Sequence, residues 1–116
     1  RGHGDARRLV DERFAGMHAV HTNNNLCLIV FGLKLAEGDL MRGLSQTVAM
    51  GLDSDCTAAS AGSILGAVLG KRAIAPELYE CFHDRMDTYL KNTEAFSIRD
   101  MAKRYSALAH KVHSRL

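Results

Sequence analysis

The chain has 116 residues, of which 47% are hydrophobic and 24% are charged, and it contains a single proline. This composition matches one globular domain and excludes a disordered, collagen-like or low-complexity chain. The formal net charge is +2, a surplus too small to indicate the basic face of a nucleic-acid-binding protein.

Three helices are predicted in the amino-terminal part of the chain. Apolar residues at helical spacing, separated by charged ones, predict a half-exposed helix over residues 5–17. The polar run at residues 22–25 can cap a second helix over residues 26–36, which is apolar on every face and should be buried all round. Asp39 can cap a third helix that runs to about Met50.

A fourth helix is predicted over residues 57–70, a segment built almost entirely of Ala, Ser, Gly, Ile, Leu and Val. Gly62, Gly66 and Gly70 lie four residues apart and therefore share one helical face. Glycine inside a helix costs about 1 kcal/mol relative to alanine. Its repetition on one face predicts that another backbone packs closely there.

The remaining residues predict two further helices. Pro76 is expected in the first turn of a fifth helix, from Glu77 to about Leu90, and Ser97 opens a sixth at Ile98. The side chains expected to face inward from these two helices are Leu78, Cys81, Phe82, Arg85, Met86, Met101, Tyr105, Leu108 and Val112. No strand pattern is evident. The sequence therefore predicts an all-α fold, an orthogonal bundle of about six helices.

Two of the six helices, those over residues 26–36 and 57–70, lack a polar face. A chain of this size buries only about two-thirds of its unfolded surface, which is too little to enclose both. The sequence therefore predicts a single domain over residues 1–116 that is the carboxyl-terminal part of a larger domain or a truncated relative; otherwise the chain associates with itself or with a partner. The start at Arg1, without methionine or an apolar signal segment, also indicates a processed or truncated beginning.

The cysteines and the longest apolar stretch bear on the location of the chain. Cys27, Cys56 and Cys81 are widely spaced and form no CxxC pair, so neither a disulfide framework nor a thiolate zinc site is expected. A reducing cytoplasm is the favoured location. The apolar stretch at residues 26–33 is far shorter than the roughly 20 residues of a membrane-spanning helix, so no membrane partner is expected.

Asp53 and Asp55 form the most suggestive group, in a loop that leads through Cys56 and Thr57 into the fourth helix. Clustered oxygen ligands suit hard cations. Two like charges this close repel each other unless a cation or a helix N-terminus offsets them. Capping of the helix by either aspartate is the alternative explanation, and on these residues alone it is the more common one.

Two pairs of histidines could also hold a metal. His18 and His21, like His110 and His113, are three residues apart, and two histidines on one helical face can bind zinc. No third ligand lies at an expected spacing, so capping, surface exposure or ordinary polar packing is the preferred interpretation for each pair.

The stretch GLDSDCTAASAGSILGAVLG at residues 51–70 resembles the carboxyl-terminal metal motif of the ADP-ribosylglycohydrolase family. Upstream, HTNNN at residues 21–25 and EGDL at residues 37–40 resemble the segment that precedes this motif in bacterial members. APEL at residues 75–78 and the last predicted helix also fit. The resemblance therefore covers roughly residues 20–108 in order.

The resemblance implies an all-α enzyme with two magnesium ions that hydrolyses the glycosidic bond between ADP-ribose and a side chain or a related ribosyl acceptor. It implies metal ligands at Asp53 and Asp55, with Cys56 or Thr57 beside them. A thiol suits magnesium poorly, so Cys56 can leave its coordination place to water or to Thr57. The residues expected to contact the ADP-ribosyl ligand are His21, Asn24, Asn25 and Ser54.

The family's other metal ligands, a Thr/Ser-Asp-Asp triplet and a nearby acidic residue, lie in an amino-terminal half that has no counterpart in these residues. Two carboxylates alone cannot fill two six-coordinate ions. Two hypotheses follow. The chain is a magnesium-dependent hydrolase once its missing half, or a separate chain, completes the site; alternatively, it is a non-catalytic relative that acts as a self-associating binding or assembly module.

Overall fold

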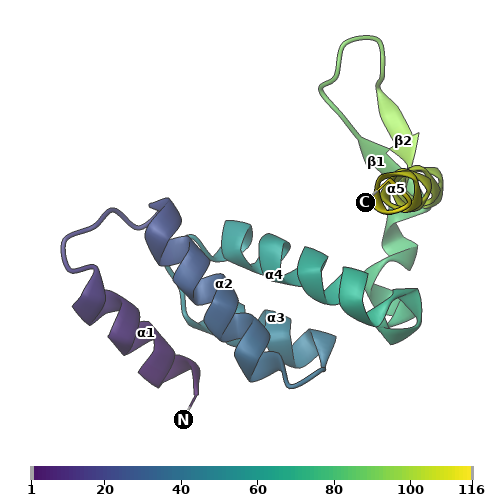
Figure 1. The fold of residues 1–116 in the computed structure, drawn as a ribbon. Coiled ribbons are helices and arrows are strands. Elements are labelled where there is room, and N and C mark those ends of the chain that lie inside the picture. Colours follow the sequence, from purple (N-terminus) through teal and green to yellow (C-terminus); the bar gives the residue numbers. More distant parts are fainter. Residues whose placement is uncertain (1, 116) are drawn as a thin grey trace. The chain divides into compact units, whose positions relative to one another are not determined.

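The computed structural model describes residues 2–115. The chain divides into two compact units, Arg1–Ile74 and Ala75–Leu116. The α-helices of the first unit are α1 (His3–Arg13), α2 (Thr22–Ala36), α3 (Leu40–Ala49) and α4 (Ser54–Leu69), which Figure 1 shows as the purple to teal ribbons. The all-α fold class predicted from the sequence is confirmed, apart from one small β-hairpin in the second unit. The prediction of a single domain over residues 1–116 stays a prediction.

Helices α2, α3 and α4 pack on one another, and α1 packs on α2. One buried cluster joins α1, α2 and the end of α3, through Ala6, Val10, Leu28 and Met50. A second cluster joins α2, α3 and α4, through Ala36, Leu40 and Leu65. These clusters hold the N-terminus of α2 and the loop that precedes α4 in place.

The ends of these helices follow local backbone chemistry. The ring of His21 accepts a hydrogen bond from the backbone N–H of Asn23, so α2 begins four residues earlier than residue 26, the predicted start. Glu37 ends α2 in the left-handed conformation, with φ 49°. The carboxylate of Asp39 accepts a hydrogen bond from Arg42 N at 2.6 Å, which confirms the predicted cap of α3. Helix α1 stops at Arg13, before the predicted end at residue 17.

Close packing occurs at glycines other than the predicted ones. A Cβ atom added at Gly32 would overlap the side chain of Thr47, and one added at Gly43 would overlap Ala36 and Leu65. These two glycines let α2 and α3 approach each other. At Gly66 and Gly70 an added Cβ would meet nothing within 4 Å, so the predicted backbone contact along the glycine face of α4 is wrong there.

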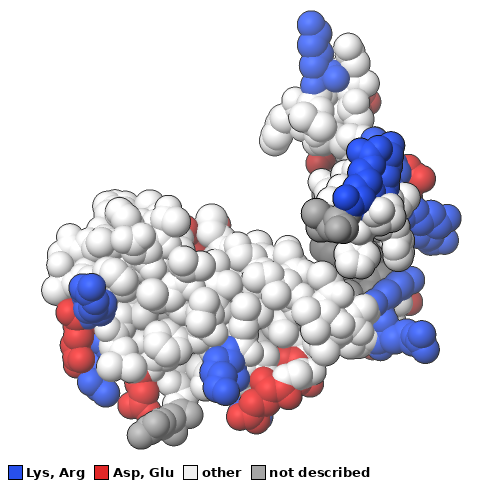
Figure 2. Space-filling view, in the orientation of Figure 1, with Lys and Arg blue, Asp and Glu red and all other residues white. Residues whose placement is uncertain are grey.

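The expectation that the two apolar helices are buried all round is also wrong for the chain as described. Helix α2 buries Asn24, Leu28, Gly32 and Ala36, whereas Leu26 on another face is 58% exposed. Helix α4 likewise leaves Val68 76% exposed. In Figure 2, few Lys, Arg, Asp or Glu side chains lie on the broad face of the first unit that is in view. Each of the two helices therefore keeps apolar side chains that no other described element covers.

In the second unit, the predicted fifth helix over residues 77–90 is wrong. The segment forms short 3-10 helices and then one strand, which pairs antiparallel with residues 95–97, so that Arg85 lies opposite Ser97 and Asp87 opposite Ala95. The left-handed backbone of His83 and Asp84, with φ 48° and 59°, ends any helix at that point. The elements of this unit are η2 (Pro76–Leu78), η3 (Glu80–Phe82), β1 (Arg85–Asp87), β2 (Ala95–Ser97) and α5 (Ile98–His113).

Helix α5 begins as predicted. The Ser97 hydroxyl accepts a hydrogen bond from Asp100 N at 3.0 Å, and the Asp84 carboxylate accepts one from Arg99 N at 2.8 Å. However, α5 contains no buried residue, so its apolar stripe, including Tyr105 and Leu108, is not an inward face in the described chain. Among the helices within residues 2–115, none combines the length and the hydropathy of a membrane-spanning segment.

Candidate metal centre

The loop before α4 brings two carboxylates to the start of that helix. The backbone turns through Gly51 and Leu52, with φ 72° and 61°, and Asp53 occupies the N-cap position of α4. The side chain of Asp53 makes no capping hydrogen bond. The capping explanation is therefore wrong for Asp53, and its carboxylate is directed elsewhere.

That carboxylate is held by α2. Asn25 Nδ2 donates a hydrogen bond to Asp53 Oδ2 at 2.6 Å, which links the first turn of α2 to the N-terminus of α4. The other end of the same carboxamide, Asn25 Oδ1, is buried and has no hydrogen-bond partner. An acceptor left unpaired inside a protein is costly unless a donor or a cation reaches it. An unpaired oxygen therefore accompanies the fixed carboxylate.

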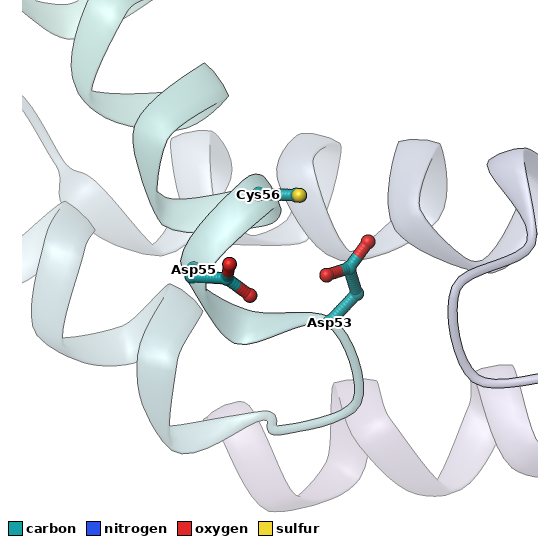
Figure 3. A group of neighbouring side chains, drawn as sticks. All are labelled: Asp53, Asp55 and Cys56. Atoms are coloured by element: carbon teal, nitrogen blue, oxygen red, sulfur yellow. The ribbon is translucent and has the colours of Figure 1, made fainter.

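Asp53, Asp55 and Cys56 form a compact group at this helix start. One ligand atom from each residue lies within 4.8 Å of the other two. Figure 3 shows the two carboxylates and the sulfur projecting from the first turn of α4 and the residue before it. Asp53 is half-buried, whereas Asp55 and Cys56 are exposed. Asp55 lies in the first helical turn, where the helix dipole favours negative charge.

The pKa of the Cys56 thiol depends on the two carboxylates beside it. The hydrogen bond between Cys56 and Asp53, together with the negative charges of Asp53 and Asp55, raises the pKa of the Cys56 thiol. Cys56 is a free cysteine. The thiol form therefore persists to higher pH than in an isolated cysteine, unless a cation offsets the two carboxylates.

The donor chemistry of this group fits a divalent cation. Two carboxylates supply the hard oxygens that Mg²⁺ and Ca²⁺ prefer, and the unpaired Asn25 Oδ1 is a further oxygen beside Asp53. Mg²⁺ requires six ligands in near-octahedral geometry, so the group can hold an ion only together with waters or ligands from elsewhere.

Thr57 and Ser54 also belong to the sequence motif, but they are not members of the acidic group. Thr57 is fully buried, and its hydroxyl donates to the backbone oxygen of Ser54 at 3.3 Å. This hydroxyl is engaged within the first turn of α4, so the ligand role of Thr57 stays a prediction. Ser54 is half-buried as the first residue of α4, next to Asp53 and Asp55.

The residues expected to contact a ligand from α2 have distinct surroundings. His21 is exposed and caps α2. Asn24 is buried, and its Nδ2 donates to the backbone oxygen of His18 at 2.9 Å. Asn24 Oδ1, like Asn25 Oδ1, is buried without a partner. Of these three residues, only Asn25 makes a side-chain hydrogen bond to the acidic group.

A shallow pocket of about 190 Å³ adjoins Asn24 and Leu52. Its walls come mainly from the end of α1 and the turn after it, and its lining includes Val10, Phe14 and Met17. Asp11 supplies the carboxylate of this pocket. The pocket is therefore lined by polar as well as apolar groups.

Neither histidine pair forms part of a comparable group. Within residues 2–115, the group of Asp53, Asp55 and Cys56 is the one set of three or more His, Cys, Asp or Glu side chains that could hold a metal ion. His18 Nδ1 accepts a hydrogen bond from the backbone of Val20 at 3.3 Å, and His21 is a helix cap. These contacts agree with the interpretation of His18 and His21 as capping or ordinary polar residues.

Two features of the site are not visible in the sequence. The hydrogen bond from Asn25 to Asp53 joins residues 28 positions apart, and no spacing rule reveals such a pair. The pocket beside Asn24 depends on the turn after α1, whereas the sequence pattern predicts one continuous helix through Phe14 and Met17. Gly16, with φ 79°, was the available signal that this helix ends early.

Comparison with known proteins identifies one family. The family model described as ADP-ribosylglycohydrolase matches residues 3–114, which is nearly the whole chain. No significant match is found among curated proteins or among solved structures. The match spans both apolar helices and the acidic start of α4, and on this basis the chain belongs to the ADP-ribosylglycohydrolase family.

Proposed function

We propose that this chain provides part of a magnesium-dependent centre that hydrolyses a glycosidic bond to ADP-ribose or to a related ribosyl group. The observation that carries the proposal is the group at the start of α4, where donor atoms of Asp53, Asp55 and Cys56 lie within 4.8 Å of one another. Membership of the family supports the hydrolytic class of reaction.

In this proposal, Asp53 and Asp55 are metal ligands with different degrees of freedom. Asp53 is fixed by the hydrogen bond from Asn25, so its second oxygen keeps a defined direction. Asp55 is exposed and can adjust to an incoming ion. A bound divalent ion supplies an activated water and orients oxygen ligands of the substrate. The residues of this chain hold negative charge at a rigid helix start, which favours precise positioning.

The ligands described here fill only part of the coordination of two magnesium ions. Two six-coordinate ions need up to about twelve ligand positions, and two carboxylates occupy few of them. The proposed centre therefore takes further protein ligands from residues outside this chain segment or from another chain. The general acid or base of the reaction is also assigned to that part.

The pocket beside Asn24 is proposed to hold a flat, donor-bearing part of the ligand. Its apolar wall suits a planar ring, and the unpartnered Asn24 Oδ1 and the Asp11 carboxylate can each accept a hydrogen bond. An ADP-ribosyl group has such a part in its adenine ring, which is planar and carries an amino group as a donor. Leu52 lines this pocket and directly precedes Asp53, so one ligand can reach both places.

The test is metal binding by isothermal titration calorimetry with Mg²⁺, followed by an assay of ADP-ribose release on the natural full-length protein. Asp55→Asn removes one negative ligand and keeps the side-chain shape. We expect it to weaken Mg²⁺ binding at least about tenfold and to abolish turnover, since even the loss of outer-shell partners lowers metal affinity about 10- to 100-fold.

Asp87→Asn is the matched control, because Asp87 is an exposed carboxylate of β1 that pairs with Arg85 and is not in the acidic group. This control should leave Mg²⁺ affinity and turnover unchanged. Unaltered Mg²⁺ binding and unaltered turnover in Asp55→Asn would defeat the proposal.

A second candidate function is a non-catalytic, self-associating binding module. The observation in its favour is the uncovered apolar surface of α2 and α4, including Leu26, Val30, Ile64 and Val68. Light scattering on the 116-residue chain tests it. A stable dimer or larger species that Mg²⁺ does not stabilise against unfolding supports this candidate, and a monomer stabilised by Mg²⁺ supports the hydrolase.

A further inference from the structure

Arg7 joins helix α1 to the backbone that leads into the acidic group. Its Nη1 donates a hydrogen bond to the backbone oxygen of Met50 at 2.6 Å, across 43 positions of the sequence. Its Nε lies 2.8 and 2.9 Å from the two carboxylate oxygens of Asp11, four residues further along α1. The guanidinium of Arg7 therefore bridges a carboxylate of α1 and the end of α3.

The carbonyl that Arg7 contacts lies at the C-terminus of α3. Met50 is the C-cap of that helix, and carbonyls at a helix C-terminus have no partner within the helix. The helix dipole also favours a cation at this end. Hydrogen bonds with a charged donor are about twice as strong as neutral ones. The contact with Arg7 is therefore a strong anchor at the point where α3 ends.

The acidic group begins three residues after this anchor. Gly51 and Leu52 turn in the left-handed region, with φ 72° and 61°, and Asp53 follows as the N-cap of α4. A leucine in this region is strained, so the turn persists only where its surroundings hold it. A Cβ atom added at Gly51 would lie 3.0 Å from Arg7 Nη1, so the glycine leaves room for the guanidinium. Asn25 fixes the side chain of Asp53, and Arg7 fixes the backbone before it.

We propose that Arg7 is a positioning residue for the metal centre, whose guanidinium holds the turn at Gly51 and Leu52 so that Asp53 presents its carboxylate to a divalent ion. This inference rests on the proposed function and gives helix α1 a part in it. Arg7 acts through the backbone of Met50 rather than through contact with the ion. Its second partner, Asp11, lines the pocket beside Asn24, so the same side chain also fixes that wall.

The charge of Arg7 separates this role from a plain electrostatic effect. A cation near the site of a divalent ion opposes binding of that ion, so removal of the charge alone should raise Mg²⁺ affinity. Loss of the positioning contact should lower Mg²⁺ affinity, because Asp53 then leaves its binding geometry more often. The two explanations therefore predict changes of opposite sign for Arg7→Met.

Arg8 provides the matched control on the same helix. It is exposed and pairs with Glu12 at 2.8 Å, with the same i,i+4 spacing as the pair of Arg7 and Asp11. Arg8→Met therefore removes the same charge and an equivalent ion pair. A second variant, Arg7→Lys, keeps the charge. Its single ammonium group replaces the planar fork, so it loses the simultaneous contact with Met50 and Asp11.

The experiment uses the natural full-length protein and these three variants. Isothermal titration calorimetry measures Mg²⁺ affinity, and mass spectrometry measures amide hydrogen exchange of residues 50–56 without added metal. We expect faster exchange there and lower Mg²⁺ affinity in Arg7→Met and Arg7→Lys. The affinity of Arg7→Met should fall about three- to tenfold, since outer-shell partners are worth about 10- to 100-fold and Arg7 is one step further away. Arg8→Met should leave both measurements unchanged.

The dependence of turnover on Mg²⁺ gives a further readout. Excess Mg²⁺ should restore the maximal rate of Arg7→Met, because Arg7 affects how well the ion is held and not the reacting atoms. The half-saturating Mg²⁺ concentration should rise by the same factor by which the affinity falls. A variant whose fold was merely damaged would keep a reduced maximal rate.

The positioning role is overturned by an Mg²⁺ affinity in Arg7→Met that equals or exceeds that of the wild type, by unaltered exchange in residues 50–56, by an equal loss in Arg8→Met, or by a maximal rate that excess Mg²⁺ does not restore. Asp55→Asn then separates the two proposals. If it weakens Mg²⁺ binding while Arg7→Met does not, the metal centre stands without a role for Arg7. If Asp55→Asn leaves Mg²⁺ binding unaltered, both proposals fail.

Discussion

The two units of the chain differ in how they use apolar residues. The first unit buries two clusters between its helices, including the fully buried Leu28 and Met50. In the second unit, helix α5 has a share of apolar residues similar to that of α3. None of the residues of α5 is buried. Both α3 and α5 are amphipathic helices with a polar N-cap, so the difference does not lie in the local sequence pattern.

An apolar stripe therefore becomes part of a core only where a second surface covers it. In the first unit, glycines at the α2–α3 contact allow close approach, and the stripes of α2, α3 and α4 meet. The acidic group depends on this packing, because Asp53 is held from α2 while Asp55 projects from α4. We therefore expect the stability of the chain and the geometry of the site to be determined mainly by the first unit.

The largest expected contrast is between two leucines. Leu28→Ala removes a fully buried side chain from the first core cluster, and it should lower the free energy of unfolding by about 2–5 kcal/mol. Leu108→Ala truncates a side chain that is 56% exposed and should change the free energy of unfolding by no more than about 0.5 kcal/mol. Urea denaturation followed by circular dichroism measures both. Equal losses would mean that the stripe of α5 is covered in solution.

A second contrast uses two helical glycines. Gly32→Ala forces a methyl group against the buried Thr47 and should destabilise the chain by about 1–3 kcal/mol. Gly66→Ala adds a methyl group where nothing lies within 4 Å and should stabilise it by up to about 1 kcal/mol through helix propensity. The same denaturation experiment applies. Destabilisation by Gly66→Ala would indicate that another surface packs on α4.

Loss of a helix cap is expected to have a smaller effect that differs between the units. Asp39→Ala removes the acceptor of Arg42 N and should cost about 1 kcal/mol. Because α3 packs in the core, its amide exchange should accelerate together with that of α2 and α4. Ser97→Ala should accelerate exchange in α5 and leave the first unit unchanged. Hydrogen exchange followed by mass spectrometry resolves the two patterns, and acceleration in both units by either variant would contradict this prediction.

The smallest expected effect concerns the reactivity of two thiols. The pKa of Cys56 is raised by its hydrogen bond to Asp53 and by the charges of Asp53 and Asp55. At neutral pH a smaller fraction is thiolate, so iodoacetamide should modify Cys56 more slowly than it modifies a cysteine in a short peptide. Asp53→Asn removes the largest cause and should speed the modification. Raising the pH should also speed it, whereas Cys81 should not respond to Asp53→Asn. An unchanged rate in Asp53→Asn would mean that Asp53 does not raise the pKa of the Cys56 thiol.

The parts of the fold predicted correctly were those with strong local signals. The cap at Asp39 and the start of α5 after Ser97 follow from side-chain hydrogen bonds within three residues, which the sequence displays directly. The helix predicted over residues 77–90 failed because its apolar spacing also fits other structures. The actual path depends on the left-handed His83 and on a carboxylate, that of Asp84, that reaches residues 13 and 15 positions later.

The all-α class, the family and the residues of the acidic group are evident from the sequence, because helical periodicity and a compact motif are local properties. Tertiary structure alone decided which face of each apolar helix is buried and which glycines permit close contact. It also decided that Asn25 rather than the helix backbone holds Asp53. These outcomes depend on which surfaces meet in space, and residues far apart in the chain make that contact.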